Sequence, residues 1–272
     1  MTRSDQTVPT HVDARRTPRS PRPLAVLLLT LAAAWLATPA LAQAYADADE
    51  LMAAFEARAE PTTLQATMEM IVTHASGQSL TREMRTWARG DEARVMKFTA
   101  PADIAGSGFL TIDDGTADET LVYLPALDRV RRVAGGQRGE SFFGSDFSYE
   151  DVEGIDPDDY EHELLEVRDS GDGPVYVVEA APRPEAGSSY DRLVLEVPEA
   201  TLLPVRVTYH RDGEAVKVLT VSDVQEVGGY LLGLERRMET LGRDSFTVLR
   251  QRDLTLDEDL PDEVFSERFL RR

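Results

Sequence analysis

The sequence contains no cysteine, and it has far fewer basic than acidic residues. Without cysteine the chain forms no disulfide bond and carries no lipid on an N-terminal cysteine, so its core must hold it together. The 29 Lys and Arg against 49 Asp and Glu give a formal net charge of −20. Such a charge repels nucleic acid and anionic membrane surfaces, and we exclude nucleic acid as a partner.

Catalytic and cofactor-binding motifs are also missing from the sequence. There is no G-x-S-x-G elbow, no H-E-x-x-H pair and no phosphate-binding glycine loop. The histidines after residue 42 are isolated from one another, and the acidic runs lack the spacing of an EF-hand loop. These residues are His74, His162 and His210, then Asp113, Asp114 and Asp118, and Asp156, Asp158 and Asp159. We therefore expect no enzyme, no catalytic residue, no metal site and no cofactor.

One apolar run, Leu24 to Ala37, is long enough to interact with a membrane, and it follows a segment rich in arginine. Ala40-Leu41-Ala42 comes after it and matches the small-residue site of a secretory signal peptide. A transmembrane anchor is the alternative, but Pro39 would interrupt such a helix near its end. The prediction is a cleaved signal peptide, residues 1–42, followed by a single domain, residues 43–272.

After a short helix that Asp47 or Asp49 can cap and Pro61 ends, the hydrophobic pattern changes to a period of two. Alternating segments separated by short turns such as Asp212-Gly213 predict consecutive antiparallel strands. More than ten such strands form either a closed barrel or a strongly curved open sheet. The predicted strands are 64–76, 80–89, 93–99, 108–113, 120–124, 129–133, 160–168, 175–181, 190–197, 203–210, 216–224, 230–240 and 246–256.

The long irregular stretch 135–159 concentrates aromatic residues among Gly, Ser and acidic residues. A solvated loop has no need of Phe142, Phe143, Phe147 and Tyr149. Rings of this kind are buried in something, since large exposed apolar patches mark binding surfaces. Two interpretations stay open: the rings plug the core of the curved sheet, or they line and gate a cavity.

Two phrases in this region are long and unusual: YLPALDRVRR at 123–132 and GSDFSYED at 144–151. Together with the preceding segment 98–110 and the order of the later strands, they resemble the outer membrane lipoprotein-sorting protein family of the LolA-like superfamily. The resemblance implies an α+β, mostly β fold, in which a curved antiparallel sheet forms an incomplete barrel with a few helices covering its concave face.

The resemblance also implies a monomeric periplasmic carrier or chaperone. Its partners would be lipid or the acyl chains of lipoproteins, carried towards the outer membrane, and an inner-membrane transporter. The alternative is a lipid-sensing module that regulates envelope stress and binds a membrane partner. The residues expected to line or gate the cavity are Phe109, Tyr123, Leu124, Phe142, Phe143, Phe147 and Tyr149.

Arg129, Arg131 and Arg132 form the densest positive cluster of the domain. In a strand, Arg129 and Arg131 share one face, and Arg132 points to the other. Because arginine recognises phosphate and carboxylate well, one hypothesis is that the cluster meets an anionic head group or a membrane partner. The alternative is pairing with surface Asp and Glu, which contributes little to stability.

We predict that the exported protein begins near Gln43, because cleavage would follow Ala42. N-terminal sequencing of the protein in the envelope fraction measures this directly. Recovery of a chain that still begins at Met1 would show an uncleaved anchor instead.

Overall fold

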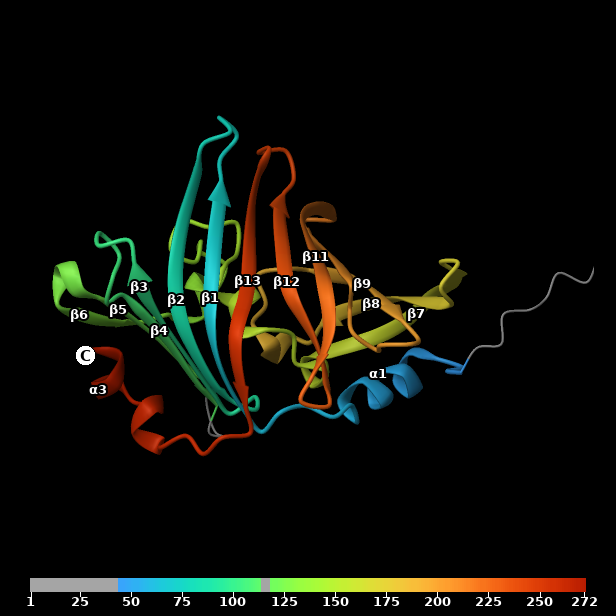
Figure 1. Ribbon diagram of the computed structural model, residues 1–272. Coiled ribbons are helices and arrows are strands. Elements are labelled where there is room, and N and C mark those ends of the chain that lie inside the picture. The colour runs from blue at the N-terminus through green and yellow to red at the C-terminus, as the bar shows by residue number, and fades with distance from the viewer. Residues whose placement is uncertain (1–43, 114–117) are drawn as a thin grey trace, which may run out of the picture. The chain divides into compact units, whose positions relative to one another are not determined.

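The computed structural model describes residues 44–113 and 118–272, so the predicted signal peptide lies outside the described residues. The fold is α+β and mostly β, and all thirteen predicted strands are present. Figure 1 shows how they are arranged in a curved sheet. The strands are β1 (Thr63–Thr73), β2 (Ser79–Arg89), β3 (Ala93–Ala100), β4 (Gly108–Asp113), β5 (Asp118–Leu124), β6 (Arg129–Arg132), β7 (Tyr160–Asp169), β8 (Pro174–Pro182), β9 (Arg192–Pro198), β10 (Arg206–Arg211), β11 (Glu214–Val227), β12 (Tyr230–Thr240) and β13 (Ser245–Leu256).

The strands form one antiparallel sheet in the order β6-β5-β4-β3-β2-β1-β13-β12-β11-β10-β9-β8-β7. The first and last strands pair with each other at the centre of the sheet, with Met70 opposite Leu249. All other neighbours follow each other along the chain, as in a meander. The sheet stays open between its edge strands β6 and β7, which confirms the predicted incomplete barrel.

Alternation along the strands divides the sheet into two faces. In β1, Met68, Met70 and Val72 are buried on the concave face, and the intervening residues are partly exposed. The hairpins use residues with positive φ: Asp212 (54°) and Gly213 (79°) join β10 to β11. A two-residue turn with positive φ at both positions matches the twist of the flanking strands, so it fixes their register.

The segment between β6 and β7 connects the two edges of the sheet by crossing its concave side. It contains the 3-10 turns Gly135–Gln137 and Pro157–Asp159 and the short helix α2 (Tyr149–Glu153). We call residues 133–159 the crossing segment. Its apolar residues join those of β1–β4 and β8–β10 in the main core.

Helix α1 (Ala48–Glu56) precedes the sheet and packs near β7. Its N-cap is Asp47, whose carboxylate accepts a hydrogen bond from the Glu50 amide at 2.9 Å. The helix places Leu51 in the main core with no exposed surface. Within 44–113 and 118–272, no helix combines the length and apolar content that a membrane-spanning segment requires.

A second core lies on the opposite face of β3–β5. The C-terminal segment, with a 3-10 turn (Asp262–Phe265) and helix α3 (Glu267–Leu270), packs Leu270 against this face. The Lys97 ammonium group donates to the Phe269 carbonyl at 3.0 Å, and a Cβ added to Gly108 would lie 2.6 Å from Leu270 Cδ1. The expectation of helices on the concave face is therefore corrected for α3, because β3–β5 are apolar on both faces.

We expect Leu270→Ala to lower the free energy of unfolding by about 2–5 kcal/mol, the range for truncating a buried leucine. Urea denaturation measures the loss. The matched control Leu241→Ala removes the same atoms from a side chain that is 43% exposed and should change little. Equal, small effects in both variants would mean that the C-terminal segment contributes nothing to the fold.

Candidate functional site

The crossing segment is held on the concave face by a buried carboxylate from the phrase GSDFSYED. Asp146 is 9% exposed, and it accepts hydrogen bonds from Thr240 at 2.7 Å, Ser245 at 2.6 Å and Thr247 at 2.7 Å. The Asp146 amide also donates to Thr247 Oγ1 at 3.0 Å. Because hydroxyl donors satisfy a buried carboxylate, Asp146 anchors the segment to the ends of β12 and β13 that meet in their hairpin.

Two further carboxylates fix helix α2. Asp151 is fully buried and accepts from Tyr190 at 2.8 Å, from Lys217 at 2.7 Å and from the Ser148 amide at 2.7 Å. Glu150 accepts from the Ser189 amide at 3.0 Å and from the Ser188 hydroxyl. Burial and then the charge of Asp151 raise the pKa of Tyr190, so its hydroxyl remains a donor. Glu150 and Asp151 of α2 thus bind the other half of the sheet and the loop that leads into it.

The aromatic rings of the crossing segment are packed against the concave face. Phe142 is 1% exposed and contacts Phe109 edge-on at 5.3 Å between ring centres. Tyr149 lies 6.0 Å from Phe109 and is stacked on it, and Phe143 contacts Phe142 at 4.9 Å. Phe147 is buried too, but it reaches the cavity described below. The structure brings these five predicted site residues into one cluster.

Tyr123 and Leu124 lie on opposite faces of β5. Leu124 packs against the main core, on the same side as the aromatic cluster. Tyr123 belongs to the second core, where its hydroxyl donates to Asp128 at 3.2 Å. Because successive side chains of a strand alternate, the structure does not bring Tyr123 to the concave face.

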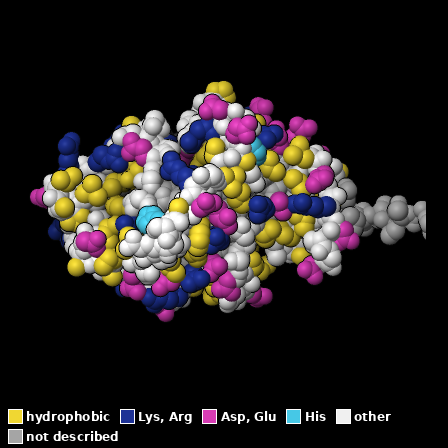
Figure 2. Space-filling model, turned by 90° about the horizontal axis from the view of Figure 1, so that it is seen from above, with side chains coloured by type: hydrophobic (Ala, Val, Ile, Leu, Met, Phe, Trp, Pro, Cys, Tyr) yellow, Lys and Arg dark blue, Asp and Glu magenta, His cyan; other side chains and the backbone are white. Residues whose placement is uncertain are grey.

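The predicted arginine cluster is largely paired. Arg131 points to the concave side, where it contacts the Glu140 carboxylate at 3.3 Å and the Tyr149 hydroxyl at 3.4 Å. Arg132 points to the other side and pairs with Glu119. Arg129 is exposed, with no ion pair in the described part of the chain. Seen from above, basic and acidic side chains are interspersed on the surface of the domain (Figure 2).

A cavity of about 200 Å³ remains between the crossing segment and the sheet. We call it the inner cavity; it lies towards the ends of β12 and β13 that are remote from their hairpin. Its wall combines the crossing segment with the start of β1, the end of β2, the first half of β12, parts of β3 and β13, and the linker after α1. The apolar lining consists of Pro61, Leu64, Met68, Ala88, Met96, Phe147, Val152, Leu203, Leu231, Leu232 and Leu249.

The polar groups on the wall of the inner cavity were not among the site residues predicted from the sequence. They come from distant segments: Arg58 after α1, Thr86 on β2, Arg94 on β3 and Arg236 on β12. No local motif connects them. The sequence carries one usable signal, because Arg94 is in phase with the buried Met96 and Phe98, and Arg236 with the buried Met238. The neighbouring inward-facing positions of these two strands are apolar. An arginine at such a position therefore breaks the alternation, and this break is the signal that points to the site.

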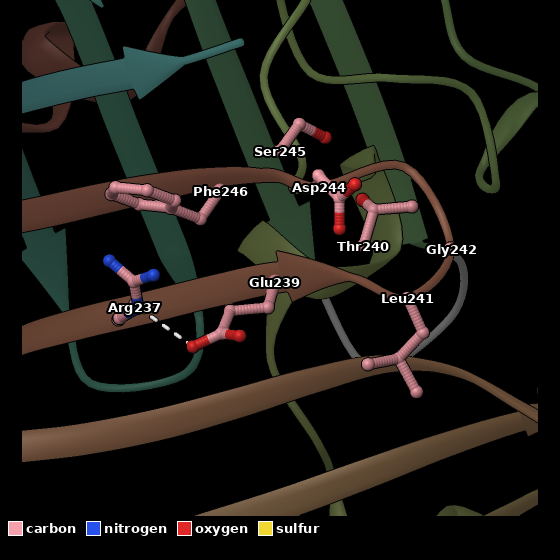
Figure 3. Close-up of a pocket in the computed structure, with 8 residues that line it drawn as sticks. All are labelled: Arg237, Glu239, Thr240, Leu241, Gly242, Asp244, Ser245 and Phe246. Carbon is pink, nitrogen blue, oxygen red and sulfur yellow. Dashed lines mark hydrogen bonds and ion pairs between the residues drawn. The ribbon is translucent and has the colours of Figure 1, made fainter. Parts of the chain in front are cut away.

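A second hollow of about 300 Å³ lies at the β12–β13 hairpin (Figure 3). Arg237 stacks on Phe246 at 3.4 Å and pairs with Glu239 at 2.8 Å, as the dashed line in Figure 3 shows. Thr240 and Ser245 donate their hydroxyl hydrogens to Asp146. Because the polar groups of this hollow are already bound to other side chains of the fold, we take the inner cavity as the candidate site.

In the described ranges, 44–113 and 118–272, no cluster of three or more His, Asp or Glu is arranged to hold an ion. The acidic runs at 156–159 form turns: Asp156 accepts from the Asp158 amide at 3.0 Å. The candidate site is a partly apolar cavity with arginine, hydroxyl and carboxylate groups on its wall.

Comparison with known proteins supports this architecture. A family model described as an uncharacterized protein matches residues 90–272. A DUF1329 family protein from Desulfovibrio piger has 28% identity and a TM-score of 0.76, covering 81% of this chain and 96% of its own. A putative outer membrane lipoprotein-sorting protein domain from Vibrio parahaemolyticus gives 28% identity and a TM-score of 0.76, covering 82% and 97%.

A LolA superfamily protein from Nitrosomonas europaea has 19% identity and a TM-score of 0.69, covering 83% of this chain and all of its own (100%). At that identity the similarity concerns the fold alone. A sequence search of curated proteins finds no match. The solved relatives therefore share the curved sheet over nearly their whole lengths.

We expect Asp146→Ala to lower the free energy of unfolding by about 3 kcal/mol, because each buried donor left without a partner costs about 1–3 kcal/mol. Asp146→Asn keeps one acceptor oxygen and should lose less. Asp172→Ala, in an exposed turn, is the matched control. If urea denaturation finds Asp146→Ala as stable as the control, Asp146 does not anchor the crossing segment.

Proposed function

This chain belongs to the DUF1329 family and has the LolA-like fold, and from this premise we propose that it is a periplasmic carrier for lipid or for the acyl chains of lipoproteins. The observation that carries the proposal is the inner cavity, an apolar space between the curved sheet and the crossing segment. The Vibrio relative, described as a putative lipoprotein-sorting domain, supports a role of the same type.

The energetics of acyl-chain burial favour such a site. Each buried CH₂ contributes about 0.8 kcal/mol, so ten carbons give on the order of 8 kcal/mol. A carrier needs this apolar contact but few hydrogen bonds to the chain, because it must release the cargo again. The lining supplies leucine, methionine and phenylalanine side chains from six separate segments.

The size of the inner cavity constrains how cargo enters. About 200 Å³ is below the roughly 300–1,000 Å³ of typical ligand pockets. A long acyl chain would therefore displace part of the crossing segment, whose residues on the cavity wall are Phe147, Asp151 and Val152. In this proposal the packed rings of Phe109, Phe142, Phe143 and Tyr149, with Leu124, line the space that opens along the concave face when the crossing segment is displaced.

The remaining elements of the proposal concern the partners. Arg129, exposed at the sheet edge near Arg131 and Arg132, would meet an anionic head group or a membrane partner such as an inner-membrane transporter. Tyr123 lies in the second core and has no part in this cavity. The proposed role requires no catalytic group, metal or cofactor.

Filling the inner cavity tests the proposal. Ala88 lines the cavity and neighbours Leu64 and Arg94 in the sheet, so Ala88→Trp should occupy the space that the acyl chain needs. We expect the affinity for a fluorescent fatty acid to fall at least tenfold. The control is Ala126→Trp, which adds the same ring to the exposed 3-10 turn Pro125–Leu127.

Melting temperatures separate a blocked cavity from a damaged fold, and Ala88→Met provides a smaller filling with a smaller expected loss. Unchanged affinity in a folded Ala88→Trp protein would place lipid elsewhere on the chain. A wild-type protein that binds no fatty acid and extracts no lipid from vesicles would contradict the carrier proposal itself.

A further inference from the structure

Arg236 is the unusual residue of the inner cavity. Its neighbours across the sheet are Val221 and Leu249, and Leu249 belongs to the main core, so the side chain lies on the concave side. It forms no hydrogen bond or ion pair with the residues that the structure describes. Arg236 is exposed to the solvent of this open cavity, while partial desolvation of its guanidinium group and then the charge of Arg94 lower its pKa. The guanidinium group therefore reaches into the cavity with its donors uncommitted.

Arg94 lies beside Arg236 and uses only part of its donor capacity. One terminal nitrogen donates to the carbonyls of Val152 at 2.7 Å and Glu153 at 3.3 Å, at the end of α2. Its other nitrogens form no hydrogen bond within the described ranges. Burial lowers the pKa of Arg94, while the carboxylates of Asp91 and Glu153 raise it. The hydrogen bonds to α2 hold this arginine in place on the cavity wall.

Two further donors on the same wall have no partner among the described residues. Thr86 is 3% exposed, and its hydroxyl forms no hydrogen bond. The Nε of Arg58 is likewise buried and unpaired. Buried polar groups without partners are uncommon in folded proteins, and each costs about 1–3 kcal/mol. Two such donors on one cavity wall indicate that a ligand with acceptor atoms would bind there.

The wall of the inner cavity carries three arginines, Arg58, Arg94 and Arg236, and three carboxylates, Glu60, Asp91 and Asp151, of which two are paired. Asp151 is paired with Lys217, and Glu60 with Arg58. After these pairs, Arg94 and Arg236 face a single remaining carboxylate of the lining, Asp91, which lies exposed in the turn between β2 and β3. In a chain with a net charge of −20, two neighbouring arginines with uncommitted donors on one cavity wall favour an anionic ligand.

We infer that the inner cavity binds the anionic group of an amphiphile, a carboxylate or a phosphate, between Arg236, Arg94 and Thr86, with the apolar tail against Met68, Met96 and Leu232. This inference rests on the proposed carrier function and names its cargo class. Guanidinium groups bind carboxylate and phosphate through paired N–H donors, and a surrounding of low polarity strengthens such bonds. The head group thus lies inside the protein, and a neutral lipid of the same length lacks this interaction.

The test compares dodecanoic acid with dodecanol, which share a chain length and differ in the charge of the head group. Isothermal titration calorimetry is carried out with wild type, Arg236→Met and the control Arg206→Met, which removes a charge from the outer face of β10. Wild type and Arg206→Met should bind the acid at least tenfold more tightly than the alcohol. Arg236→Met should bind both alike, at the affinity that wild type has for the alcohol.

Stability supplies a second readout. Because Arg236 has no partner, Arg236→Met should melt at or above the wild-type temperature. Thr86→Val, which keeps the shape of the side chain but removes the hydroxyl, should weaken acid binding several-fold and leave alcohol binding unchanged. Inorganic phosphate, titrated alone and in competition with the acid, distinguishes a site for a free anion from a site that requires the tail.

The outcomes separate the inference from the proposed function. Equal affinities of wild type for acid and alcohol, or equal losses for both in Arg236→Met, would overturn the anionic site while leaving a lipid carrier. Phosphate binding that depends on Arg236, without binding of either lipid, would support the anion site and contradict the carrier. Absence of binding for all three ligands would overturn both.

Discussion

The chain must pass from β6 to β7, the two free edges of a thirteen-stranded sheet, and it does so across the concave face. That passage would be unfavourable for an acidic segment unless its carboxylates found donors. Asp146 accepts hydrogen bonds from three hydroxyl groups in the β12–β13 hairpin region, and Asp151 accepts hydrogen bonds from Lys217 and Tyr190. These buried acceptors hold the crossing segment in place, and the aromatic packing, the position of α2 and the inner cavity all depend on them.

The crossing segment fills the concave face unevenly. Near Asp146, the rings of Phe142, Phe109 and Tyr149 pack as a core. Towards the end of α2 the packing loosens, and Arg94 binds the terminal carbonyls of that helix while Arg236 stays unpaired. The same segment is therefore packed core at one end, and at the other it borders the inner cavity through Phe147, Asp151 and Val152.

Much of the fold could be predicted from the sequence, because alternation and turn chemistry are local signals. The pattern of Met68, Met70 and Val72 indicates a strand with one buried face, and Asp212-Gly213 indicates a hairpin. The pairing of β1 with β13 and the place of α3 could not be derived from local patterns, because both depend on contacts between distant segments. Arg94 and Arg236 were missed for the same reason: they are 142 positions apart, and only the curvature of the sheet brings them together.

Photo-crosslinking with a fatty acid that carries a diazirine on its chain tests most directly whether the concave cavity holds the cargo. Peptide mapping by mass spectrometry identifies the labelled residues. The account predicts labels on Met68, Met96 and Leu232, which line the inner cavity, and their loss when unlabelled fatty acid competes. Labels confined to the exposed residues Leu127, Leu165 and Leu241, without competition, would contradict it.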